Sequence, residues 1–80
     1  MVTKDELGEW VVEALATLGG SGSVTDVSKL IWENHGEQIE SSGDMFYTWQ
    51  YDVRWAAHQL RRLGTIRPVE RGVKKWVLSS

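Results

Sequence analysis

A regular stripe of apolar residues between positions 44 and 63 constrains the fold of this chain more than any other feature. Its members follow one another in steps of 3, 4, 3, 4 and 3 residues: Phe46, Trp49, Val53, Ala56, Leu60 and Leu63. Steps of three and four residues place side chains on one face of an α-helix. The stripe therefore predicts a long helix over about residues 44–63, with Asp44 as its cap and Gly64 at its end.

Two shorter helices are predicted before this one. Thr3 precedes Glu6 by three positions, as in a capping box, and an apolar stripe follows as far as Gly19, which predicts a helix over about residues 4–18. A second helix is predicted from a cap at Thr25 or Asp26 to near residue 36, between a loop at 21–23 and a polar loop at 36–43. Its apolar side is formed by Val27, Leu30 and Ile31.

The residues after Gly64 change from a helical pattern to β-branched runs. The runs 65–69 and 73–78 flank Glu70-Arg71-Gly72, where a glycine suits a tight turn, so we expect a two-stranded antiparallel hairpin. An isolated hairpin is marginally stable in water, so we expect three apolar side chains to anchor it on the helices: Ile66, Trp76 and Leu78.

The order of three helices and a hairpin predicts an α+β fold of the winged helix-turn-helix type. In that fold the third helix enters the major groove of DNA and the hairpin, the wing, lies alongside. A chain of 80 residues has room for one small core, so we expect residues 1–80 to form a single domain.

Composition excludes several classes of protein. The chain has no cysteine, which excludes a disulfide framework and a thiolate zinc site. It has no apolar run near the ~20 residues of a membrane span, and we expect a cytoplasmic protein with no membrane partner. The two histidines, His35 and His58, lie on different predicted helices, and no phosphate-binding glycine-lysine loop or nucleophile elbow occurs. We therefore expect no catalysis, no metal and no cofactor.

The net charge of −2 conceals two halves of opposite sign. Residues 1–47 carry two lysines and nine acids, a net charge of −7, whereas residues 48–80 carry seven basic residues and two acids, a net charge of +5. A chain that separates its charges in this way presents its basic end to a polyanion.

The basic end supplies the candidate DNA contacts. Opposite its apolar stripe, the third helix carries Thr48, Tyr51, Arg54, His58, Arg61 and Arg62. The wing carries Arg67, Arg71, Lys74 and Lys75. Arginine suits guanine edges and phosphate, and the wing cations suit phosphate. Some have other roles without a ligand, because Arg61 and Arg62 also favour the helix dipole and Lys74 and Lys75 also protect a sheet edge.

The roles of four tryptophan and tyrosine residues remain open. Trp32 lies off the stripe of the second helix. We expect it either to pack under a neighbouring loop or to form part of an interaction surface. Tyr47, Tyr51 and Trp55 step by four residues along the third helix, where they pack against the core or wing or form a dimer seam. For Trp55, directly opposite the core, we expect cover from the wing or from another chain.

Residues 53–73, with the end of the first helix at Leu18-Gly19-Gly20-Ser21, resemble the N-terminal winged-helix domain of Mrr-type restriction endonucleases. The matching segments are Arg54-Trp55-Ala56, Arg61-Arg62-Leu63-Gly64 and Arg71-Gly72-Val73. The resemblance implies DNA recognition on behalf of a separate nuclease domain, a structural role for Trp55 and a wing tip at Arg71-Gly72. The chain departs from the family in two respects: its next aromatic residue comes later, at Trp76, and no lysine follows an acid or glutamine by two residues, as a nuclease of that class requires.

We therefore predict a non-enzymatic module that binds double-stranded DNA, as a small bacterial or phage regulator or as the targeting module of a restriction-type enzyme. Because one module reads few base pairs, useful specificity calls for a homodimer or an attached catalytic domain. The alternative is a protein-interaction or dimerisation module on the same scaffold, favoured by the acidic N-terminal half. A weaker third possibility is a phage protein that imitates or blocks a host regulator.

Overall fold

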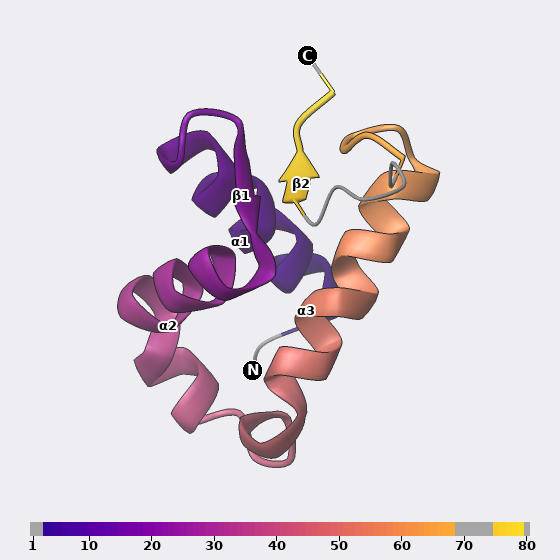
Figure 1. Ribbon diagram of the computed structural model, residues 1–80. Helices are drawn as coiled ribbons and strands as arrows, with labels where there is room; N and C mark the ends of the chain where they lie inside the picture. Colours follow the sequence, from indigo (N-terminus) through magenta and orange to yellow (C-terminus); the bar gives the residue numbers. More distant parts are fainter. Residues whose placement is uncertain (1–2, 69–74, 80) are drawn as a thin grey trace.

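The computed structural model describes residues 3–68 and 75–79, which form three helices and a two-stranded antiparallel sheet (Figure 1). In chain order the elements are α1 (Lys4–Thr17), β1 (Ser21–Ser23), α2 (Val24–Glu40), α3 (Met45–Arg62) and β2 (Lys75–Val77). The predicted α+β class is confirmed at this level. Figure 1 shows the two strands side by side in the upper half of the molecule, with α2 and α3 meeting below them through a short turn.

Helix α1 agrees with its prediction to within one residue. The Thr3 hydroxyl accepts a hydrogen bond from the Glu6 backbone N–H at 3.2 Å, as a capping residue does. The helix ends where Gly19 and Gly20 adopt φ values of +86° and +107°, a region that side chains with a Cβ disfavour.

The prediction for α2 is wrong at both ends. Ser23, rather than Thr25 or Asp26, caps the helix by accepting a hydrogen bond from the Asp26 N–H at 3.1 Å. The helix bends at His35 and continues to Glu40 through residues that we expected to form a loop. Ile39 explains the extension, because its fully buried side chain joins the core and holds the last turn in place.

Helix α3 lies where the apolar stripe places it, but the two ends of the stripe are not buried. Phe46 and Leu63 are exposed because they lie at the ends of a helix that is longer than the core beneath it. Ala57 and Asp52 are buried instead, since α3 packs against both α1 and α2 and the buried arc is wider than one stripe. Asp44 precedes the helix, yet its side chain makes no capping hydrogen bond.

The sheet differs most from its prediction. Strand β2 pairs with β1, which we expected to be a loop, in the register Ser21↔Val77, Gly22↔Trp76 and Ser23↔Lys75. Of the predicted hairpin, the described contacts between its two arms are the Ile66↔Leu78 bridge and a 2.8 Å hydrogen bond from the Arg67 N–H to the Val77 carbonyl. The predicted turn at Gly72, with Arg71 and Lys74, lies outside the described residues.

The core forms where the three helices and the strands meet. Leu7, Val11, Leu15, Val27 and Val53 are fully buried there. Ile66 is also fully buried, while Trp76 and Leu78 pack half-buried against the core. These three side chains anchor the C-terminal segment on the helices, as predicted.

Candidate nucleic-acid interface

A groove runs between the N-terminal half of α2 and the middle of α3. This α2–α3 groove has a volume of about 580 Å³ and is lined by Val24, Thr25, Ser28, Lys29, Trp32, Glu33, Trp49, Gln50 and Arg54. Its two cations, Lys29 and Arg54, come from different helices and both are exposed. Hydroxyl and amide groups accompany them, and the exposed Glu33 also lines the groove, so its two cations and one carboxylate leave a net positive charge together with hydrogen-bond donors.

Two stacked indoles form part of the wall of this groove. The rings of Trp32 and Trp49 lie 5.7 Å apart between centroids, with their planes inclined by 18°. A Cβ built on Gly36 would lie 3.4–3.6 Å from three ring atoms of Trp32, so the backbone one turn further along α2 packs on the same indole. Trp32 therefore packs against α3 and its own helix rather than under a loop, which corrects the prediction.

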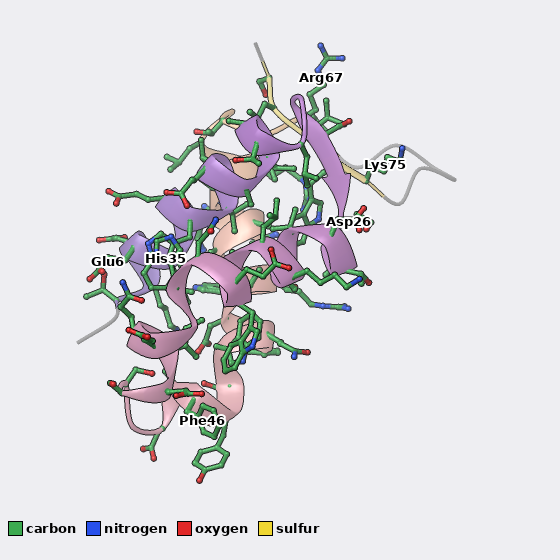
Figure 2. All side chains as sticks on the ribbon, turned by 90° about the vertical axis from the view of Figure 1, so that its left-hand side faces the viewer. Glu6, Asp26, His35, Phe46, Arg67 and Lys75 are labelled. Atoms are coloured by element: carbon green, nitrogen blue, oxygen red, sulfur yellow. The ribbon has the colours of Figure 1, made fainter. Side chains whose placement is uncertain are left out.

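Strand β2 adds a third cation at the end of the groove. The sheet register pairs Lys75 with Ser23, and Ser23 caps α2, whose first residues Val24 and Thr25 line the groove. In Figure 2, Lys75 lies on the same side of the molecule as Asp26 in the first turn of α2, whereas Glu6 and His35 lie on the opposite side. Lys75 is exposed on this side, with the start of α2 beside it.

The outward side of α3 continues from the groove. Tyr51 is 73% exposed, and Arg54 and His58 follow it at steps of three and four residues, so the three side chains share one side of the helix. The His58 imidazole stacks on Trp55 with 5.7 Å between ring centroids. This side therefore presents a phenol, a guanidinium and an imidazole to solvent.

Other predicted contact residues have partners within the protein. The Thr48 hydroxyl donates a 2.8 Å hydrogen bond to the carboxylate of the buried Asp52, so Thr48 supports the helix. The Arg61 Nε donates to the Arg67 carbonyl at 3.4 Å and links α3 to the segment that follows it. Arg67 itself is exposed, and Figure 2 shows its side chain projecting at the top of the molecule.

Trp55 lies further round α3, towards α1, although His58 of the outward side stacks on it. Trp55 is 42% exposed and lines a second groove, between α1 and α3, with the Lys4 Nζ 5.8 Å from its ring centroid. Within the described residues, helix α1 and not the wing therefore covers part of Trp55. Arg62 follows Trp55 by seven residues, or two helical turns, and so lies on the same side of α3.

The face opposite Lys75 carries acidic groups. His35 stacks on Trp10 with ring centroids 4.0 Å apart, and its Nε2 lies 3.0 Å from the Glu13 carboxylate, so the imidazole joins α1 to the bend in α2. Glu6 lies on this face in Figure 2. Residues 3–68 and 75–79 contain no group of acids and histidines arranged to hold a metal ion.

The groove residues of α2 were not among the predicted contacts. The signal that identifies them is helical spacing, because Thr25, Ser28, Lys29 and Trp32 stand at i, i+3, i+4 and i+7 and thus on one face. Gln50 was also absent from the predicted contacts, because it lies on the flank of α3 between the buried stripe and the outward side.

Among the described helices, none has the length and apolarity needed to cross a membrane. No family model, curated protein or solved structure matches the chain.

Proposed function

We propose that this chain is a winged helix-turn-helix module that binds double-stranded DNA, with α3 in the major groove. The element order supports the proposal, because α2 and α3 follow one another through a short turn and a C-terminal strand folds back beside them. The resemblance to the N-terminal domain of Mrr-type enzymes supports the same role. As the N-terminal domain of such an enzyme, the module would position a nuclease domain rather than cleave DNA itself.

The observation that carries the proposal is the α2–α3 groove. It brings Lys29 and Arg54 together from two helices, and the strand register adds Lys75 at its end. Separate segments thus supply positive charge to one side, where Asp26 and Glu33 of α2 also lie, while Glu6 and Glu13 occupy α1. A duplex presents two phosphate strands beside each groove, and cations supplied by neighbouring elements suit contacts with both strands.

The contacts divide into two kinds. Tyr51, Arg54 and His58 project from α3 and would reach base edges and phosphates, with the Arg54 guanidinium suited to the two acceptors of guanine. Lys29, Arg67 and Lys75 would contact the phosphate backbone and carry no sequence information. Arg71 and Lys74 of the predicted wing belong to this second kind.

Replacing Arg54 tests the proposal at its centre. For Arg54→Gln we expect the affinity for a labelled duplex to fall by about 1–3 kcal/mol, or roughly fivefold to more than a hundredfold in Kd, measured by fluorescence anisotropy. Lys29→Gln should weaken binding to all sequences alike, since the lysine contacts phosphate.

Lys4→Gln is the matched control, because it removes the same charge from α1, away from the groove. We expect its Kd to stay close to that of the wild-type chain. Equal losses from Lys4→Gln and Arg54→Gln would contradict the proposal, since binding would then depend on total charge and not on the groove.

A protein partner is the second candidate, and Tyr47 is the observation that favours it. Its side chain is 84% exposed at the start of α3, edge-on to Phe46 with ring centroids 5.1 Å apart. Exposed aromatic pairs are frequent in protein interfaces. If Tyr47→Ala leaves duplex affinity unchanged while the Arg54 variant also binds normally, this candidate replaces the first.

A further inference from the structure

Two side chains of the α2–α3 groove, Gln50 and Arg54, are neighbours on the surface of α3. They stand four residues apart, about one helical turn, and both are exposed and line the groove. Within residues 3–68 and 75–79, no hydrogen bond or ion pair engages either side chain, whereas Thr48 and Arg61 of the same helix are both engaged. The amide and the guanidinium can therefore both form hydrogen bonds with a ligand.

The backbone that carries these two side chains is held by the core. Trp49 directly precedes Gln50, and its buried indole stacks on Trp32 of α2. Val53 directly precedes Arg54 and is fully buried. Packing thus fixes both positions along α3, as a contact of defined geometry requires.

The chemistry of Gln50 suits a base edge better than a phosphate. A carboxamide has one acceptor and one donor group, and adenine presents the complementary pair, its N6 amino group and N7, in the major groove. A phosphate offers only acceptors, so the Gln50 carbonyl would have no partner there. Arg54 beside it suits guanine, whose O6 and N7 are both acceptors.

Glu33 on the α2 side of the groove favours the same reading. It is exposed and lines the groove together with Gln50 and Arg54. A carboxylate repels phosphate, whereas the edges of adenine and cytosine carry amino groups that it can accept from. The groove therefore disfavours a phosphate beside Glu33 and tolerates a base edge.

The spacing of the two side chains limits which base pairs they can reach. Four residues correspond to about 6 Å along α3. Successive base pairs lie about 3.4 Å apart along a duplex. The two contacts therefore fall on neighbouring base pairs or on pairs with one pair between them.

We propose that the target of this chain contains an adenine and a guanine at that spacing, read by Gln50 and Arg54. The inference rests on the proposed function, because it takes α3 to lie in the major groove. It assigns a specificity role to Gln50, which was absent from the contacts predicted from sequence. It also describes the target as duplex DNA that carries this two-base element.

The inference is tested by selection from duplexes with randomised positions, followed by sequencing of the bound fraction. The wild-type chain should enrich an A·T pair and a G·C pair that are neighbours or have one pair between them. In fluorescence anisotropy, replacing either pair should raise Kd roughly fivefold to more than a hundredfold.

Variants of Gln50 assign the adenine contact. Gln50→Ala should remove the preference at the A·T pair and keep the preference at the G·C pair. Gln50→Glu should change the first preference from adenine to cytosine, because a carboxylate accepts from the cytosine amino group but is repelled by adenine N7. A merely structural role for Gln50 would not move the preference from one base to another.

Gln59→Ala is the matched control for Gln50→Ala. Gln59 lies on α3 nine residues further on, which is two and a half turns, and it lines the groove between α1 and α3 instead. This variant should keep the affinity and both preferences of the wild-type chain. Circular dichroism of each variant checks that the fold is retained.

Two failures are distinguishable. If the wild-type chain binds duplexes in a salt-dependent manner but enriches no such pair, or if Gln50→Ala keeps every preference, this inference is overturned and the proposed function stands. If no duplex binds at low ionic strength, the proposed function fails and this inference fails with it.

Discussion

Neighbouring side chains of α3 divide between supporting the fold and facing outward. Arg54 and Tyr51 lie where a helical wheel of the sequence places them, on the side away from the apolar stripe. Thr48 lies on an exposed turn as well, yet its hydroxyl holds Asp52 at 2.8 Å. The wheel gives the direction of a side chain but not its hydrogen-bond partner, which is why the predicted contact set included Thr48.

Thr48→Val separates these two roles. Valine keeps the branched shape and removes the donor, so the partly buried Asp52 carboxylate loses a hydrogen bond, and the free energy of unfolding should fall by about 1 kcal/mol. We expect urea denaturation to show this loss while the Kd for duplex DNA stays unchanged. A variant of wild-type stability that binds DNA weakly would return Thr48 to the contact set.

At the scale of elements, the helices were predictable and the sheet was not. Apolar steps of three and four residues are local, and they place α1 and α3 within one residue of their observed ends. Strand β1 is Ser-Gly-Ser, which has no β-branched or alternating pattern, and it pairs with residues more than fifty positions away. Such a strand forms because β2 lies next to it, and the local sequence pattern does not predict that pairing.

The extension of α2 was missed because Gly36 is ordinarily a helix terminator. Gly36 ends no helix here, since its φ lies outside the positive region that Gly19, Gly20, Gly43 and Gly64 occupy. The single apolar residue beyond it, Ile39, is too little to establish a helical period in the sequence.

Gly36→Ala tests the continuity of α2. Alanine is favoured over glycine within a helix, and its Cβ would meet the Trp32 ring at ordinary contact distance, so unfolding should become about 0.5–1 kcal/mol less favourable. Gly64→Ala is the matched control with the opposite sign, because φ at Gly64 is +81° and alanine there should cost about 1 kcal/mol. Thermal and urea unfolding measure both changes. A destabilising Gly36→Ala would mean that the chain is not helical at this position.

For the molecule as a whole, charge distribution matters more than net charge. The formal charge of −2 is unusual for a DNA-binding module, and Glu33 lies in the groove beside Lys29, whereas Glu6 and Glu13 lie on α1. The sequence already separates the two signs between its halves. The sequence does not show that Lys29, from the acidic half, lies in one groove with Arg54, because this contact depends on how α2 packs on α3. It also does not show that Lys75 lies on the same side, because its position depends on how β2 pairs with β1.

The salt dependence of duplex binding tests the central claim most directly. If cations of α2, α3, β2 and the wing neutralise about five to seven phosphates, a plot of log affinity against log salt concentration should have a slope of about −4 to −7. The double variant Lys29→Gln, Arg54→Gln should flatten that slope by about two. A duplex that fails to bind at low ionic strength, or a slope near zero, would contradict the account.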